Sequence, residues 1–216
     1  MKSTKDIWVF GDYRNYFQNR VTLQILARAV DLAATTGGNV CAVVFGHNVS
    51  NYVAEYIAHG AEKVYVIDDA VLDLYSLETY SRLLTGLAEK YKPETILVGA
   101  TKFGQEMAPR VAKKLRTGLT ADCIDFEINE KGFLVQIAPS FGGNLIAKII
   151  TPVKRPQMAT VRPGTFQELR HDDNANGETV RLPLPDDFPE DKIRMVASEF
   201  RPAKKQKIEN ADIVIC

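Results

Sequence analysis

Val40-Cys41-Ala42-Val43-Val44-Phe45 is an uninterrupted apolar run of six residues. It is too short for a core helix and rich in β-branched and aromatic side chains, so it predicts a strand buried on both faces. Three similar runs are expected at residues 7–10, 63–67 and 95–99. Strands that are apolar throughout, rather than alternating, are typical of a parallel sheet covered on both sides.

Helical patterns lie between these strands. Residues 21–34 place apolar side chains three or four positions apart and end at Gly37-Gly38, which predicts an amphipathic helix with a glycine stop. Further helices are expected at residues 51–59, 77–91 and 105–115. Alternating strands and helices indicate right-handed crossovers and hence an open, doubly wound α/β fold with a parallel sheet.

The pattern changes after Leu115. Short strand-like segments follow at residues 124–128, 133–138, 145–152 and 157–162, and Asn129-Glu130-Lys131-Gly132 is a hairpin turn candidate. We therefore predict that antiparallel or mixed strands extend the core. Residues 167–187 read as a polar loop, with further strand candidates at 180–184, 195–201 and 213–215 and a basic cluster at 204–207. The whole of 1–216 is predicted to be a single α/β domain, with a parallel core at 1–116 and a strand-rich extension at 117–216.

The composition excludes several classes of function. Lys plus Arg equals Asp plus Glu at 27 each, so no broad basic field predicts nucleic-acid binding. No apolar run approaches the ~20 residues of a transmembrane helix, and the N-terminus has no targeting pattern, which predicts a cytoplasmic location without a membrane partner. The three cysteines are far apart and form no metal-binding pair, so we predict no metal.

Few residues indicate chemistry by themselves. The sequence has neither a GxxxxGK[ST] loop nor a GxGxxG motif, and no nucleophile motif accompanies its histidines, so no catalytic residue is predicted. Gly99-Ala100-Thr101 is the best placed turn for an anion, because it follows a predicted strand and precedes a helix. Arg155 and Arg162 each precede a proline and are expected on extended backbone, with Arg162 on the strand face that carries Thr160.

Several linked motifs carry a family resemblance. They are Thr117-Gly118-Leu119-Thr120-Ala121-Asp122-Cys123, Phe141-Gly142-Gly143-Asn144 and Arg155-Pro156-Gln157-Met158-Ala159-Thr160-Val161-Arg162-Pro163-Gly164, supported by Val98-Gly99-Ala100-Thr101. In this order the chain resembles the N-terminal domain of the alpha subunit of electron-transfer flavoprotein. The resemblance implies a fold like that of adenine-nucleotide hydrolases. It selects seven candidate cofactor-binding or subunit-interface residues: Thr101, Asp122, Asn144, Arg155, Gln157, Thr160 and Arg162.

The resemblance also implies a function. Such alpha subunits pair with a beta subunit. The pair takes electrons from flavin dehydrogenases, such as the acyl-CoA dehydrogenases of fatty acid oxidation, and passes them to downstream acceptors. Some relatives bifurcate electrons from NADH. FAD is bound by an alpha-subunit domain that would follow Cys216, and the beta partner carries AMP or a second FAD. We therefore expect a non-catalytic electron-carrier subunit whose present segment docks the beta subunit, positions the flavin module and holds no FAD alone.

Two alternatives remain open from the sequence. The first is a stand-alone adenine-nucleotide-binding domain of related fold, although Gly11-Asp12-Tyr13-Arg14 after the first strand does not supply a pyrophosphatase-type loop. The second is a purely scaffolding subunit, which applies if the natural protein ends near Cys216.

Overall fold

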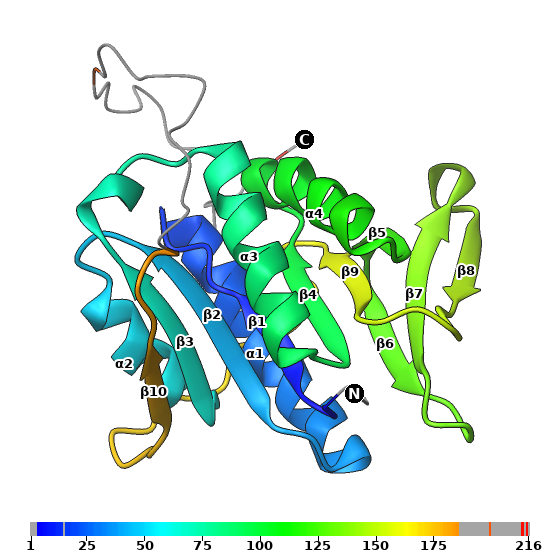
Figure 1. Ribbon diagram of the computed structural model, residues 1–216. Coiled ribbons are helices and arrows are strands. Elements are labelled where there is room, and N and C mark those ends of the chain that lie inside the picture. The colour runs from blue at the N-terminus through cyan, green and yellow to red at the C-terminus, as the bar shows by residue number, and fades with distance from the viewer. Residues whose placement is uncertain (1–3, 15, 186–198, 200–212, 214, 216) are drawn as a thin grey trace.

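A seven-stranded parallel sheet forms the centre of the protein. The computed structural model describes residues 4–14, 16–185, 199, 213 and 215. The strands lie in the order β10-β3-β2-β1-β4-β9-β5, and every neighbouring pair is parallel (Figure 1). Their bounds are β1 (Ile7–Phe10), β2 (Val40–Gly46), β3 (Lys63–Asp68), β4 (Thr95–Gly99), β5 (Leu119–Cys123), β9 (Gln157–Val161) and β10 (Glu178–Arg181).

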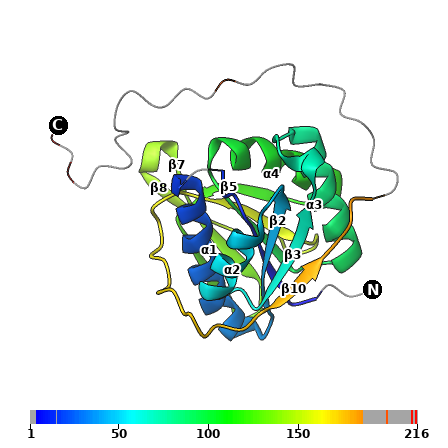
Figure 2. The same cartoon turned by 90° about the vertical axis from the view of Figure 1, so that its left-hand side faces the viewer.

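Helices cover both faces of this sheet (Figure 2). One face carries α1 (Tyr16–Thr36) and α2 (Ser50–Ala58), and the other carries α3 (Leu77–Tyr91) and α4 (Lys102–Leu115). Because successive strand residues point to opposite faces, Val9 and Val44 join the core under α1 while Phe10 and Phe45 join the core under α3. Two apolar layers therefore enclose the sheet, as its uninterrupted apolar strands require.

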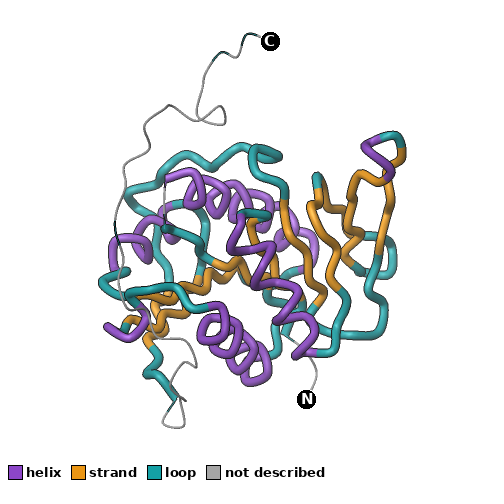
Figure 3. Tube along the Cα trace, turned by 90° about the horizontal axis from the view of Figure 1, so that it is seen from above, coloured by secondary structure: helices purple, strands orange, loops and turns teal. Residues whose placement is uncertain are grey.

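A smaller antiparallel sheet stands beside the main body (Figure 3). It consists of β6 (Asp125–Ile128), β7 (Leu134–Ser140) and β8 (Leu145–Ile149), with the short 3₁₀ turn η2 (Phe141–Gly143) joining the last two strands. Arg28 of α1 ties this sheet to the body, because its Nη2 donates to the Phe126 carbonyl oxygen at 2.5 Å and to Asp125 Oδ1 at 3.0 Å.

The predicted α/β fold and parallel sheet are confirmed, and so is the added antiparallel region. One part of the expectation is wrong: β9 does not extend the core as a mixed or antiparallel strand but lies inside the parallel sheet, between β4 and β5. The strand β5 itself was not predicted, because Thr117-Gly118 before it and the bulge between Thr120 and Cys123 interrupt its strand pattern. Both segments join neighbours that are distant in sequence, which periodicity does not reveal.

Other expectations are confirmed in outline. Helix α1 begins at Tyr16, five residues before its predicted start, and β10 ends at Arg181 instead of continuing to residue 184. The strand candidates 195–201 and 213–215 and the basic cluster 204–207 lie, apart from isolated residues, outside the described part of the chain. The division of the chain into a parallel core at 1–116 and a strand-rich extension at 117–216 stays a prediction. Within the described residues, the longest and most apolar helices fall short of what crossing a bilayer requires.

Candidate functional site

The strand order reverses between β1 and β4. The chain proceeds outward from β1 to β2 and β3, then returns to build β4 on the other side. In open parallel sheets, ligands bind at this point, beyond the carboxyl ends of the strands. Here Gly11-Asp12-Tyr13-Arg14 follows β1, and Ala100-Thr101 follows β4.

A buried carboxylate occupies this crevice. Asp12 is only 3% exposed, and its Oδ2 accepts a hydrogen bond of 2.9 Å from the Thr101 hydroxyl. The same hydroxyl oxygen accepts the Gly104 N–H at 3.1 Å and so caps α4. Thr101 therefore has both of its hydrogen-bonding functions engaged within the protein. Thr101 thereby links β1, β4 and α4, and anion binding at this turn stays a prediction.

Arg14 completes the cluster. Its Nη2 lies 2.7 Å from Asp12 Oδ1, and its guanidinium packs against two aromatic rings, 3.8 Å from the Phe103 centroid and 4.4 Å from the Tyr75 centroid. Such cation–π contacts strengthen where water is excluded. Burial raises the pKa of Tyr75 to about 12, so this phenol is neutral at physiological pH.

Three further candidates meet at the carboxyl ends of β5 and β9. Arg162 Nε and Nη2 both donate to Asp122 Oδ2, at 3.1 and 2.5 Å, and the Asp122 backbone N–H donates to the Thr160 hydroxyl at 2.8 Å. The hydrogen bond and charge of Asp122 raise the pKa of Arg162. Asp122 has a φ of 58°, a conformation that Asp tolerates better than most residues. The predicted shared orientation of Arg162 and Thr160 is thus compatible with the structure.

Arg155 and Gln157 lie at the opposite ends of the parallel strands, where β4 and β9 begin. Arg155 forms an ion pair with Glu94, and Gln157 Nε2 donates to the same carboxylate at 3.3 Å. Arg155 Nη1 also donates to the carbonyl oxygens of Thr151 and Lys154, at 2.9 and 2.8 Å. These groups stand before β4 and β9, at the amino ends of parallel strands. They cannot reach the carboxyl-end cluster, because a full strand separates the two edges.

Asn144 is separate from all of these. It follows η2 at the tip of the β7–β8 hairpin and is exposed. The seven candidates thus occupy four places: the switch point, the Asp122 cluster, the amino-end edge and the hairpin tip.

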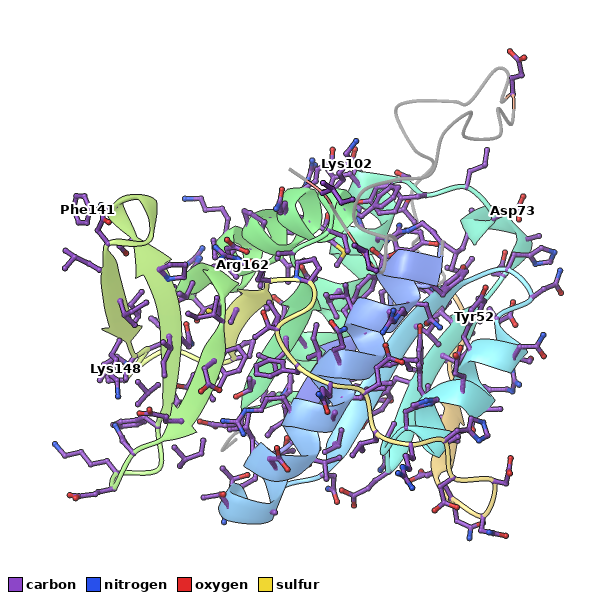
Figure 4. All side chains as sticks on the ribbon, turned by 180° about the vertical axis from the view of Figure 1, so that it is seen from behind. Tyr52, Asp73, Lys102, Phe141, Lys148 and Arg162 are labelled. Carbon is purple, nitrogen blue, oxygen red and sulfur yellow. The ribbon has the colours of Figure 1, made fainter. Side chains whose placement is uncertain are left out.

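Sequence reasoning missed one feature, the apolar surface of β8 and η2. Phe141 is 81% exposed, Leu145 59% and Ile146 55%, with Ile149 and Ile150 also exposed. Figure 4 shows Phe141 and Lys148 on this outlying sheet, away from the body. We call these five apolar residues the hairpin surface. The signal was visible in Leu145-Ile146-Ala147-Lys148-Ile149-Ile150, which does not alternate as a half-buried strand should.

The described side chains include two free thiols in the core. Among the described residues no group of His, Cys, Asp and Glu has the arrangement of a metal site. Cys41 and Cys123 are free and buried, and burial raises the pKa of each thiol to about 12. Both are therefore protonated and unreactive at neutral pH.

Comparison with known proteins identifies the family. The electron transfer flavoprotein domain model matches residues 7–187, which is most of the chain. The chain belongs to the electron transfer flavoprotein family. This match covers the parallel sheet, the antiparallel sheet and all seven candidate residues.

Several curated relatives of the electron transfer flavoprotein family are similar over most of the chain. Electron transfer flavoprotein subunit alpha of Thermoanaerobacterium thermosaccharolyticum is 45% identical over 217 residues, covering 100% of this chain and 65% of the relative. Protein FixB of Clostridium saccharobutylicum is 41% identical over 183 residues, covering 83% and 54%. Lactate dehydrogenase (NAD(+),ferredoxin) subunit LctC of Acetobacterium woodii is 43% identical over 162 residues, covering 75% and 39%. The chain spans less than two thirds of the length of each of these relatives.

The switch point does not fit the flavin dinucleotide that the family name implies. A pyrophosphate there would face the buried Asp12 carboxylate, and the Thr101 hydroxyl is already engaged. The guanidinium of Arg14 is already paired with that carboxylate, so a phosphate would have to compete with Asp12 for it. No step of flavin chemistry is therefore assigned to these residues.

Proposed function

We propose that this chain is the partner-docking portion of an alpha-type electron-carrier subunit. It pairs with a beta-type subunit of related fold and positions a flavin-bearing module. The FAD is held outside the described residues, and the beta partner carries AMP or a second FAD. The chain acts in this proposal as an electron-carrier subunit without catalysis of its own, which family membership supports.

The single observation that carries this proposal is the hairpin surface. Strand β8 is an edge strand with apolar side chains exposed on both faces, a condition that promotes aggregation unless another chain covers it. The beta subunit is the partner that family membership suggests. Its apolar contact would bury Phe141, Leu145 and Ile146 at the centre of the interface, while the Lys148–Glu127 pair would lie at its rim.

A second surface supports the positioning role. Asp122 and Arg162 form an exposed ion pair at the carboxyl ends of β5 and β9. The Thr160 hydroxyl accepts a hydrogen bond from the Asp122 backbone N–H and so anchors that residue. A planar guanidinium on an anchored backbone suits hydrogen bonds to another domain. We infer that the flavin module docks at this edge, near Arg162 and Lys102, which Figure 4 shows on the same side of the molecule.

The donors and acceptors are proposed from the relatives alone. Exchange with flavin dehydrogenases such as acyl-CoA dehydrogenases is proposed from the family resemblance, and one relative is named as an electron transfer flavoprotein alpha subunit. The relative named for NAD(+) and ferredoxin favours a bifurcating complex instead. The alternative of a stand-alone adenine-nucleotide-binding domain is less favoured, because Asp12 occupies the switch point.

The test is assembly with the beta-type subunit. Ile146→Asp places a charge in the centre of the hairpin surface and should weaken assembly at least tenfold in titration calorimetry. Val71→Asp is the matched control, because Val71 is similarly exposed at 64% but lies beyond β3, remote from the hairpin in sequence and sheet. Equal affinities of the two variants would contradict docking through β8.

A further inference from the structure

The groove at the amino ends of β4, β9 and β5 contains cations that form no ion pair with the described side chains. These three strands are neighbours in the sheet, so the segments that precede them lie together. The groove has a volume of about 600 Å³ and lies between the ends of α3 and α4 and the segment before β9. It is distant from the switch point, and its Val153 follows Ile150 of the hairpin surface closely in the chain.

Four cationic side chains line this groove without a carboxylate partner among the described residues. They are Lys92, Lys114, Arg116 and Lys154. The fifth cation, Arg155, is paired with Glu94 outside the lining, and Glu89 is the one acid among the described lining residues. The carboxyl ends of two helices contribute about half a negative charge each. The groove therefore keeps a net charge of roughly +2, from four cations, one acid and two helix ends.

The ends of α3 and α4 fix the backbone positions of two of these residues. Lys92 and Arg116 are the C-terminal caps of α3 and α4, with φ values of 53° and 54°, and their N–H groups bond back to Ala88 and Ala112. Lys114, Arg116 and Lys154 are exposed, so water and salt screen their mutual repulsion, and a bound anion would meet their combined positive charge. The remaining lining is apolar, from Ala88, Pro93, Leu115, Val153 and Pro156.

We propose that this groove binds an organic phosphate with at least two negative charges and an apolar moiety. The cations would contact the phosphates, and the apolar residues would contact the organic part. A concave site of this size with an apolar lining and a few convergent charges fits a small ligand better than a flat protein surface. The proposal is independent of the hairpin surface and of flavin binding.

The test uses the natural protein in its native assembly, with ATP and inorganic pyrophosphate as probes in titration calorimetry. We expect saturable ATP binding that is weaker at higher salt, and pyrophosphate binding at least fivefold weaker because it lacks the apolar part. Lys114→Gln and Lys154→Gln should each weaken ATP binding about tenfold, since each removes a charge-assisted contact.

Lys113→Gln is the matched control, because Lys113 lies beside Lys114 in the last turn of the same helix but does not line the groove. Its ATP affinity should stay unchanged. The proposal is overturned if ATP binding is absent or not saturable, or if the two groove variants bind ATP as well as the control variant. Equal affinities for ATP and pyrophosphate would overturn the assignment of an organic moiety.

Discussion

Replacing Thr101 by valine should destabilise the domain without impairing its docking. The substitution keeps the shape of the side chain but removes the hydroxyl that donates to Asp12 and accepts from Gly104. Loss of the helix cap costs about 1 kcal/mol. Loss of a hydrogen bond to a buried carboxylate costs about 1.5–3 kcal/mol. The free energy of unfolding should therefore fall by about 2–4 kcal/mol, and Tm by roughly 5–15 °C for a chain of this size.

The assay is urea unfolding followed by the fluorescence of Trp8, the one tryptophan in the chain, which is 1% exposed. Thr101→Ser is the control, because serine retains the hydroxyl and should recover most of the lost stability. Binding of the beta-type subunit to folded Thr101→Val should be unchanged. A loss below about 1 kcal/mol would refute the reasoning from the cap and the buried hydrogen bond, as would an equal loss in the serine variant.

Three further predictions concern other positions. Arg162→Ala should weaken assembly measured by calorimetry more than it weakens folding, because its exposed pair with Asp122 contributes only about 0–1 kcal/mol to stability; a Tm loss without any loss of affinity would contradict this. Gly104→Ala should lower the free energy of unfolding in urea by about 3 kcal/mol, because the new Cβ would lie 1.8 Å from a backbone carbonyl oxygen. Gly86→Ala in α3 is the contrast: no atom lies within 4 Å of the new Cβ, so the free energy of unfolding should rise by roughly 0.5–1 kcal/mol. Burial raises the pKa of Cys123 from 9.0 to about 12, so the stability contributed by its protonated thiol is complete below pH 9 and is lost as pH rises toward 12. The difference between the urea midpoints at pH 8 and pH 10.5 should therefore be smaller in Cys123→Ala than in the unsubstituted chain. An equal difference in both would oppose the assignment.

Local patterns were enough for the first half of the fold. Helix α3 and strand β4 lie at their predicted residues, because apolar spacing and nearby breakers define such elements within a few turns. The site was less accessible to such reasoning. The sequence selected Thr101, Asp122 and Arg162 but could not show that they serve two different clusters.

The sequence alone determined the family and the alternation of buried strands with helices, because motif order and residue periodicity are properties of the chain. Only the tertiary structure decided that β9 lies between β4 and β5, and that Thr101 bonds to Asp12, 89 residues away. It also decided that β8 is an exposed edge while β7 beside it is buried. The physical reason is that sheet neighbours and burial arise from contacts between distant segments, and the free energy of those contacts depends on the whole packed core rather than on any local pattern.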